Sequence, residues 1–460
     1  MHRKINAQEN NIQKKRTFLL LVVYVLLCIL CVLLTLVFTS CKTREAGIAK
    51  NESQKEVSES TSEEALREEE PVQKVEITIW DSCEAKERLA LVESNDNFMK
   101  ENPSIKIETR HFRSQEELED QFEAASLAGS GPELVLMSMD SMIRLASSNV
   151  LKEITSEVDY NRIIDGLVEI SRYNGRNYII PFRSSDFLVF FYNKDLVEEA
   201  PTNFEGVIEH CKKVNDFKKQ IYGWLLNEAE PDWIIPFIGG YSDWIVDYDS
   251  YSLALDNKAT EKTLEFLNYI YSEEKILPYE VGYEEMNQLF KNGSVSMIIN
   301  GTWAIEEYKN GGLNFGISKI PIAWQGSKNP TPLISGTGFM INVNCYGNEL
   351  EAIKAYIDYM LSEEIQISWT WNTQSFPVLK DIDSNSTFSN DELIYEAFQQ
   401  AKICRGKPYD KLMRVIRDAF RTNIENVIRG NITPSEAVVK IQEDAIKLRS
   451  EGLDVEELKK

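Results

Sequence analysis

KVEITIW at residues 74–80 and IKIETRHF at residues 105–112 are the two stretches that decide the fold class of this chain. Both alternate apolar and polar side chains, which is the period of a β-strand with one buried face. Residues 85–100 and 115–128 carry apolar side chains at helical spacing, and the short apolar run at residues 134–137 is a third candidate strand. Strands that alternate with helices predict an α/β fold with a mainly parallel sheet and covering helices.

The same alternation continues along the rest of the chain. FLVFFY at residues 187–192 is a continuous apolar run, which suits a buried strand. Further expected elements are helices at residues 260–271, 283–291 and 350–361, strands at 295–300 and 338–343, and a helical C-terminal third whose last helix begins near Thr433-Pro434. Because 460 residues are too many for one compact core, this order predicts two α/β lobes joined by more than one crossing of the chain.

Composition and charge limit the classes of partner. The apolar fraction of 43% and the charged fraction of 27% are ordinary for a globular protein. The net charge is -23, and it becomes more negative without the basic N-terminal residues. So acidic a chain repels phosphate backbones and anionic lipid surfaces, which argues against a nucleic-acid partner and against electrostatic docking on a membrane.

Cysteine spacing and sequence motifs argue against metal chemistry and catalysis. Cys83, Cys211, Cys345 and Cys404 lie far apart without a C-x-x-C pair. We expect buried thiols, with one or two disulfides as the alternative. The chain contains no G-x-S-x-G, H-E-x-x-H or GxxxxGK[ST] motif. We therefore expect neither an enzyme nor a cofactor, and any ATP hydrolysis would occur on another protein.

The N-terminus predicts export. Lys14-Lys15-Arg16 precedes an uncharged apolar run at residues 18–38, which is long enough to span a bilayer. Phe38-Thr39-Ser40-Cys41 then resembles a bacterial lipobox, in which Cys41 would be acylated after removal of residues 1–40. The alternative is an uncleaved helix with the bulk of the chain outside. Both interpretations place the folded part outside the cell and tethered to the membrane.

Residues 41–73 predict a flexible spacer. They are rich in Glu, Ser and Lys and nearly free of aromatic side chains. Such a segment cannot bury enough apolar surface to order itself, so it would lift the folded part off the membrane. A lipoprotein needs a spacer of this kind, which favours the interpretation with an acylated Cys41.

Several segments together resemble a known family. FMKENP at residues 98–103, AGSGPELV at 128–135, YNKDL at 192–196 and FKNGSVSMIINGTW at 290–303 stand in the order found in bacterial extracellular solute-binding proteins of the sugar-binding class, which includes the maltose-binding protein. Residues 336–341 and 351–361 resemble the strand and helix that follow in that family, and Phe376-Pro377-Val378 resembles a later turn.

The resemblance implies a two-lobed fold of the periplasmic-binding-protein type, with a hinge of crossing segments and a ligand cleft between the lobes. It also implies a monomer that delivers its ligand to a membrane permease of the ATP-binding cassette class. The lobe boundaries that we expect are 74–185 with 322–378 for lobe 1, and 186–321 with 379–460 for lobe 2. In this family a ligand closes the hinge because it contacts both lobes.

Candidate ligand residues follow from the chemistry of sugars, which offer hydroxyl edges and weakly apolar faces. Trp303 follows the strand at residues 295–300, and the matching family residue stacks on ligand; the alternative is a core tryptophan that caps a helix. Trp233 lies where family members place a cleft aromatic, or it packs inside its lobe. Neighbouring candidates, each with a structural alternative, are the acceptors Glu230 and Asp232 and the turn residue Tyr241.

Further candidates stand at strand ends and crossings, where ligands bind in open α/β sheets. Asp140 follows the strand at residues 134–137 and is either a ligand acceptor or a helix N-cap. Asp186 precedes FLVFFY and is either a ligand contact or a hinge cap. Trp80 and Asp81 end the first strand, and Trp371 flanks the late turn.

Two departures from the maltose-binding branch put malto-oligosaccharides in doubt. That branch has an aromatic residue where this chain has Met137, and a C-terminal tryptophan near the position of Met413-Arg414. The functional alternatives to sugar import are a binding protein for another solute and a sensory binding protein that reports to a membrane kinase. An exported glycosidase is a further alternative, although a carboxylate pair at catalytic spacing cannot be read from sequence.

Overall fold

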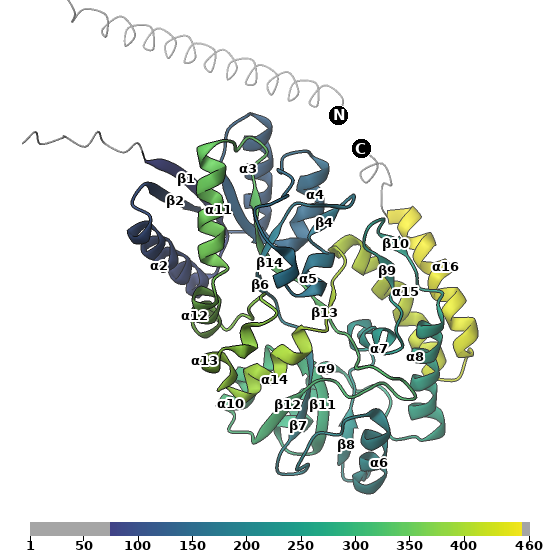
Figure 1. Cartoon of the computed structure of the whole chain (residues 1–460). Coiled ribbons are helices and arrows are strands. Elements are labelled where there is room, and N and C mark those ends of the chain that lie inside the picture. Colours follow the sequence, from purple (N-terminus) through teal and green to yellow (C-terminus); the bar gives the residue numbers. More distant parts are fainter. Residues whose placement is uncertain (1–73, 453–460) are drawn as a thin grey trace, which may run out of the picture. The chain divides into compact units, whose positions relative to one another are not determined.

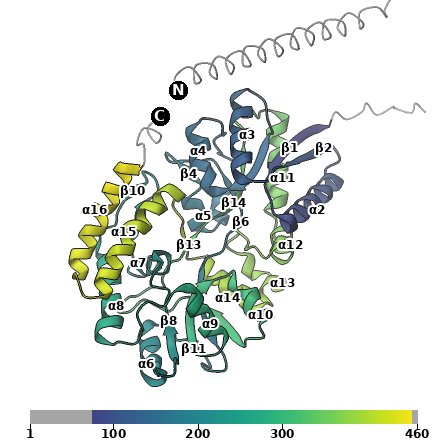
Figure 2. The ribbon, with the colours of Figure 1, turned by 180° about the vertical axis from the view of Figure 1, so that it is seen from behind.

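Two β-sheets organise the part of the chain that the structure, a computed structural model, describes, residues 74–452 (Figures 1 and 2). The expected export segment, Cys41 and the spacer at residues 41–73 lie outside the described residues. Within residues 74–452, no helix is both long and apolar enough to cross a membrane.

Lobe 1 is built on a five-stranded sheet. In spatial order its strands are β2 (Ile105–His111), β1 (Val75–Asp81), β3 (Leu134–Ser138), β14 (Gly336–Ile341) and β6 (Ile180–Ser184). Strand β1 is parallel to β2 and β3, whereas β14 is antiparallel to both β3 and β6. The alternation expected for β1 appears as far as Ile79, because Ile77 and Ile79 are buried and Thr78 between them is half-buried, whereas Trp80 and Asp81 are both buried.

Helices cover this first sheet. Ser114 begins α3 by accepting a hydrogen bond from the Glu117 amide, as an N-cap does. Helix α11 packs against β1, α3 against β3, and α12 against α2. The helices of lobe 1 are α2 (Ala85–Glu101), α3 (Gln115–Leu127), α4 (Met142–Ser147), α5 (Asp165–Glu169), α11 (Asn348–Met360) and α12 (Glu363–Thr373).

Lobe 2 is built on a four-stranded sheet in the order β12 (Phe315–Ser318), β7 (Leu188–Asn193), β11 (Val295–Gly301) and β8 (Tyr222–Leu225). Strand β11 is buried along its whole length, including the polar Ser296 and Asn300. The helices of lobe 2 are α6 (Phe204–Val214), α7 (Pro236–Gly240), α8 (Lys258–Asn268), α9 (Tyr283–Lys291), α10 (Ala304–Asn310), α13 (Ser386–Ser389), α14 (Glu392–Ala401), α15 (Asp410–Ile428) and α16 (Pro434–Gly452).

Short two-residue strands connect these larger elements. The three pairs are β4 (Arg172–Tyr173) with β5 (Arg176–Asn177), β9 (Val246–Asp247) with β10 (Ser252–Leu253), and β13 (Leu333–Ile334) with β15 (Arg405–Gly406). The last pair joins a segment that leads into β14 to the segment that leads into α15.

The chain crosses between the two sheets three times, and the crossing segments are hydrogen-bonded to one another. The first crossing links β6 to β7, the second links β12 to β14, and the third follows α12. The Ser184 amide donates to the Phe376 carbonyl at 2.9 Å, and the Ser185 amide donates to the Ser335 carbonyl at 2.8 Å. These bonds tie all three crossings into one junction, which is the geometry expected of a hinge.

The structure corrects several details of the sequence-based expectations. The last two strands of the lobe 1 sheet involve antiparallel pairing, so that sheet is mixed rather than mainly parallel. Helix α8 starts two residues before residue 260 because the Asn257 side chain caps the Thr260 amide, and it changes to π-helical geometry at Tyr269–Glu273. The four cysteines between residues 74 and 452 are buried free thiols, as expected.

Gly338 marks a constraint in the lobe 1 sheet. The register between β14 and β6 shifts at Thr337/Gly338, and a Cβ atom at Gly338 would lie 2.5 Å from the Ile180 carbonyl oxygen. We predict that Gly338→Ala lowers the free energy of unfolding by about 1–3 kcal/mol because backbone must move to admit the methyl group. Urea denaturation measures this change. Gly282→Ala is the control, since a Cβ there has nothing within 4 Å. Equal stability of the two variants would contradict the packing described here.

Candidate ligand-binding site

A polar cavity of about 570 Å³ lies beside the junction of crossing segments. The turns after β1 and β2, the end of β3, Thr337 of β14 and the first and third crossing segments contribute to its lining. The carboxyl ends of parallel strands meet at one edge of a sheet, and this edge is where open α/β folds bind ligands. Among the lining residues, Ser82, Gln115, Ser185, Thr337 and Gln374 carry hydroxyl or amide groups.

Charged side chains also line the polar cavity. Glu87 and Arg183 form an ion pair of 2.9 Å across it, and both side chains are mostly shielded from solvent. The Nε atom of Arg183 is buried without a hydrogen-bond acceptor among residues 74–452. Arg113 is exposed and forms no ion pair with another residue of 74–452, so the cavity offers donors as well as acceptors.

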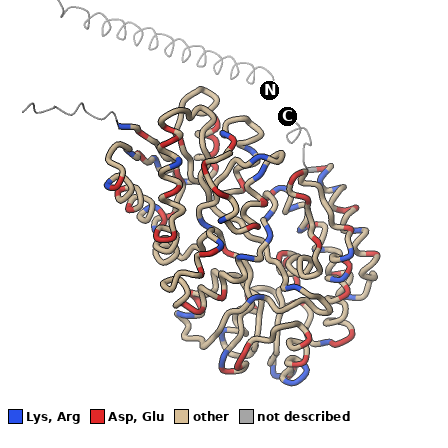
Figure 3. Tube along the Cα trace, viewed as in Figure 1, with Lys and Arg blue, Asp and Glu red and all other residues tan. Residues whose placement is uncertain are grey.

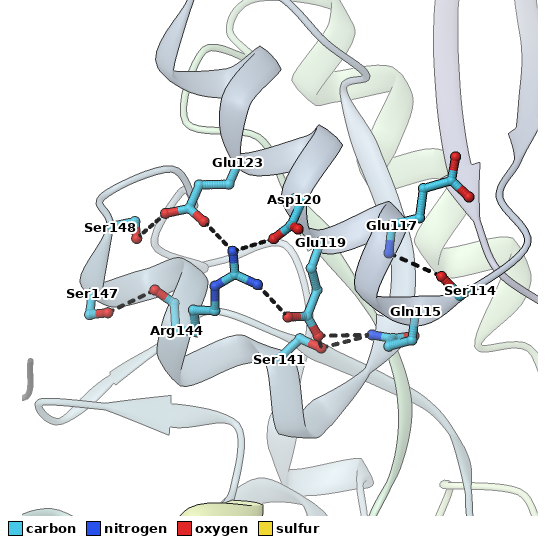
Figure 4. A network of polar contacts seen from close by, with 10 residues as sticks. All are labelled: Ser114, Gln115, Glu117, Glu119, Asp120, Glu123, Ser141, Arg144, Ser147 and Ser148. Carbon is cyan, nitrogen blue, oxygen red and sulfur yellow. Dashed lines mark hydrogen bonds and ion pairs between the residues drawn. The ribbon is translucent and has the colours of Figure 1, made fainter. Parts of the chain in front are cut away.

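A hydrogen-bonded network holds Gln115 at the edge of the cavity (Figure 4). Its amide donates to the Ser141 hydroxyl at 2.7 Å, and Ser141 in turn bonds to Glu119. The guanidinium of Arg144 contacts Glu119 at 2.8 Å and Asp120 at 2.7 Å, which ties α3 to α4. The network joins α3, α4 and the turn Met139–Ser141 that follows β3. It therefore fixes the first turn of α3 relative to the end of β3.

An aromatic wall in lobe 2 consists of Trp233, Tyr283 and Trp303. Trp233 is buried and donates from its indole nitrogen to the Ile299 carbonyl at 2.8 Å. The ring of Trp303 lies edge-on to Trp233, with ring centroids 6.2 Å apart, and its indole nitrogen donates to the Tyr283 hydroxyl at 2.8 Å. Trp303 nevertheless keeps 45% of its surface exposed, so an apolar indole face remains available.

Gly301 and Asp186 explain how the exposed indole comes to lie next to the cavity. A Cβ atom at Gly301 would lie 2.0 Å from the ring of Trp303, so the glycine lets the indole fold back over the end of β11. The neighbouring Thr302 donates its hydroxyl to Asp186 at 2.6 Å, and Asp186 lines the polar cavity. The hydrogen bond thus links the residue before Trp303 to the cavity lining, to which no ring of the aromatic wall itself belongs.

The acidic candidates near Trp233 are engaged by α15. Asp232 accepts two hydrogen bonds from Arg417, from Nε at 2.9 Å and from Nη2 at 2.7 Å. Glu230 forms a weaker, half-exposed ion pair with Arg421 at 3.3 Å. Two parallel bonds to one guanidinium hold a carboxylate firmly, so Asp232 positions α15 beside the aromatic wall.

Asp140 extends from lobe 1 toward the segment before α15. Its carboxylate lies 3.0 Å from the Lys407 ammonium, which also contacts Asp410 at 2.9 Å. Burial raises the pKa of Asp140, and the charge of Lys407 partly offsets this rise. The alternative N-cap role is not found, because Ser141 stands at the N-cap position of α4 and Ser138 caps the preceding turn by accepting from the Asp140 amide.

Four candidate residues lie away from both the polar cavity and the aromatic wall. Trp80 is buried against Phe112, and Asp81 is buried in contact with His111 at 2.9 Å, so both are covered inside lobe 1. The Tyr241 hydroxyl donates to the Trp324 carbonyl at 2.8 Å, a packing contact of lobe 2. Trp371 is exposed at the end of α12, with its ring 6.4 Å from that of Phe388, outside the cavity lining.

Several lining residues were not anticipated from the sequence. Arg113 and Gln115 directly follow β2, so the rule that selected residues after β1 and β3 would have found them too. Arg183 and Thr337 lie within strands, where sequence gives no sign of the lining. Within residues 74–452, no group of three His, Cys, Asp or Glu side chains is arranged as metal ligands would be.

The two tryptophans of the aromatic wall should differ in their effect on stability. We predict that Trp233→Phe lowers the free energy of unfolding by about 1–3 kcal/mol, because it leaves the buried Ile299 carbonyl unpaired. Trp303→Phe should cost less than about 1 kcal/mol, because its indole nitrogen is exposed and can bond to water. Urea denaturation of both variants makes the comparison. A loss at Trp303 as large as that at Trp233 would assign Trp303 to the core instead.

Known proteins that resemble this chain in sequence or fold are named as binding proteins for oligosaccharides. The chain is 22% identical over 439 residues to the galactooligosaccharide-binding protein of Bacillus subtilis strain 168, covering 92% of this chain and 97% of that protein. It is 23% identical over 356 residues to a maltooligosaccharide ABC transporter solute-binding lipoprotein of Streptococcus pneumoniae R6, covering 70% and 79% of the two chains. A cyclo/maltodextrin-binding protein complexed with maltotetraose has a similar fold, with a TM-score of 0.70 at 20% identity over 83% of this chain and 97% of that one.

A family model connects the fold and the site with one group of proteins. The model described as bacterial extracellular solute-binding protein matches residues 94–396, which is more than half of the chain. This range includes the aromatic wall and most of the residues that line the polar cavity. Together with the two lobes and the junction of three crossings, the match shows that the chain belongs to the bacterial extracellular solute-binding protein family.

Proposed function

We propose that this protein captures an oligosaccharide between its two lobes for import by a transporter of the ATP-binding cassette class. Two unlike surfaces carry the proposal: a cavity lined by hydroxyl, amide and charged groups, and the exposed Trp303, whose neighbour Thr302 bonds to the cavity residue Asp186. Sugars need both kinds of surface, since their hydroxyl edges form hydrogen bonds and their ring faces pack on aromatic side chains.

The named ligands of the related proteins support a saccharide. The Bacillus relative is named for galactooligosaccharides and the Streptococcus relative for maltooligosaccharides. These relatives bind different sugars at similar levels of identity to this chain, so the shared class is the oligosaccharide rather than one sugar. By resemblance, the maltose-binding branch carries aromatic residues at the position of Met137 and near that of Met413-Arg414. Met137 and Met413 are both buried here, and the missing aromatic rings favour a ligand other than a malto-oligosaccharide.

The mechanism that we propose is closure about the junction of crossing segments. Ser184, Ser185 and Phe376 belong to both the junction and the cavity lining. A ligand that contacts lobe 1 through the cavity and lobe 2 through Trp303 binds the closed arrangement better and shifts the population toward it. The protein itself performs no chemical step in this mechanism, and the closed surface is what a permease would recognise.

The proposed tether is an acylated Cys41, followed by the spacer at residues 42–73. The lipobox-like Phe38-Thr39-Ser40-Cys41 and the lipoprotein description of the Streptococcus relative support it. Acyl chains attached to one residue give stable anchoring when two or more are present. The tether would keep the binding lobes close to the permease on the outer side of the membrane.

Trp303→Ala tests the proposed ligand contact. We expect the variant to bind an oligosaccharide recognised by the wild type at least about tenfold more weakly, because it loses the stacking surface. Isothermal titration after a thermal-shift screen of neutral and acidic mono- and oligosaccharides measures the change. Tyr346→Ala is a matched control, since Tyr346 is 62% exposed and lies outside the cavity lining. If no saccharide raises the melting temperature while a peptide or polyamine does, the proposed function is wrong.

Cys41→Ser tests the proposed anchor. We expect the wild-type protein to incorporate a labelled fatty acid and to lack residues 1–40, whereas the variant incorporates no label. Cys31→Ser, which changes a cysteine inside the apolar run, should behave as the wild type does. Mass spectrometry of the membrane fraction provides the measurement. An unlabelled wild-type protein that retains residues 1–40 would support the uncleaved helix instead.

A further inference from the structure

A second hollow, of about 350 Å³, is lined only by charged side chains of α15. Helix α15 is amphipathic, with Leu412, Ile416 and Phe420 buried in lobe 2. Its opposite face forms the hollow, which we call the charged hollow. The charged hollow is lined by Asp410, Arg414, Arg417, Asp418 and Arg421.

Of the three arginines that line the charged hollow, Arg414 alone forms no ion pair with the described residues. Arg417 is held by Asp232, and Arg421 lies 3.1 Å from Asp418 and 3.3 Å from Glu230. Asp410 is paired with Lys407 at 2.9 Å. Arg414 is exposed and has no ion pair or hydrogen-bond partner for its side chain among residues 74–452. Asp232, Glu230, Asp418 and Asp410 thus pair with Arg417, Arg421 and Lys407, and Arg414 is the one guanidinium of the charged hollow without such a partner among residues 74–452.

Two residues that contact the charged hollow, Asp232 and Lys407, place it beside the candidate ligand site. Asp232, which holds Arg417, directly precedes Trp233 of the aromatic wall. Lys407, which holds Asp410, reaches lobe 1 by its ion pair with Asp140. The charged hollow thus lies between the aromatic wall and the lobe 1 residue that follows β3.

The polar cavity of lobe 1 offers similar groups. Arg113 lines it without an ion pair among the described residues, and the buried Nε of Arg183 lacks an acceptor there. Arg183 is held by Glu87 through Nη2, so the donors left without a described partner are its Nε and the guanidiniums of Arg113 in lobe 1 and Arg414 in lobe 2. The buried Nε of Arg183 is costly without an acceptor, and the exposed guanidiniums of Arg113 and Arg414 are free to bind a ligand that supplies one.

We propose that the ligand is an acidic saccharide, one that carries a carboxylate as a uronic acid unit does, and that Arg414 selects for this group. This inference rests on the proposed function and narrows its ligand class. A guanidinium matches a carboxylate with two parallel hydrogen bonds, whereas a neutral hydroxyl uses one of its donors at a time. The chain as a whole carries a charge of -23, and acidic and basic residues are spread over both lobes (Figure 3), so selection for an anion depends on local guanidiniums.

Paired titrations test the proposal on the full-length protein. The probes are a galacturonic acid trimer and the neutral galactose trimer of the same length, each titrated into the wild type, Arg414→Gln and Lys440→Gln. We expect the wild type to bind the acidic trimer at least about tenfold more tightly than the neutral one, and Arg414→Gln to lose about tenfold for the acidic trimer alone. Lys440→Gln removes the same charge from an exposed position on α16 and should change neither affinity.

Three outcomes would overturn the inference. If the wild type binds the neutral trimer as tightly as the acidic one, the ligand class is wrong while the proposed function stands. If Arg414→Gln weakens both trimers equally, or Lys440→Gln weakens the acidic trimer as much, Arg414 does not read the carboxylate. If neither trimer nor any other saccharide binds, the proposed function fails together with the inference. The affinity for the acidic trimer should also fall as salt is added.

Discussion

The hydrogen bonds between the three crossing segments are the constraint on which the site depends. The Ser184 amide bonds to Phe376, and the Ser185 amide bonds to Ser335, so three segments far apart in sequence meet at one place. Ser184, Ser185 and Phe376 also line the polar cavity, and Asp186 next to Ser185 accepts from Thr302 after β11. Any rotation of one lobe against the other must therefore change the cavity and the approach of Trp303 together.

The two lobes supply different chemistry to this junction. Lobe 1 contributes strand ends and helix starts, where hydroxyl, amide and guanidinium groups face the cavity. Lobe 2 contributes a buried tryptophan that supports an exposed one, and a helix face with an excess of arginine. Neither wall alone satisfies both the edges and the faces of a sugar ring, which is why a ligand would favour the arrangement that brings both walls to it.

Most of the fold can be predicted from the sequence, because burial periodicity is local. The strands β1, β2 and β11 and the helix α9 appear where the alternation and the helical spacing predict them. Trp303 could also be proposed from sequence, since it follows a buried strand at the edge where loops meet. The antiparallel pairing of β14 could not, because it depends on where the chain returns after a long excursion through lobe 2.

Several candidate residues lie outside the site because residues distant in sequence cover them or pair with them, which the local sequence does not indicate. Trp80 and Asp81 end a strand as Asp140 nearly does, yet Phe112 and His111 of the next strand cover them. Asp232 looks like a free acceptor in sequence, but its partner Arg417 is 185 residues away. Pairings at that separation carry no sequence signal, and they decide which carboxylates remain for a ligand.

A crystal structure of the protein with a bound oligosaccharide tests the central claim most directly. The account predicts a sugar ring against the exposed face of Trp303 and hydroxyl groups bonded to side chains of the polar cavity in lobe 1, with both lobes in contact with one ligand. A ligand bound instead in the groove between α2 and α12, where Ser94, Asn97, Ser368 and Asn372 form a separate hollow of about 490 Å³, would contradict it.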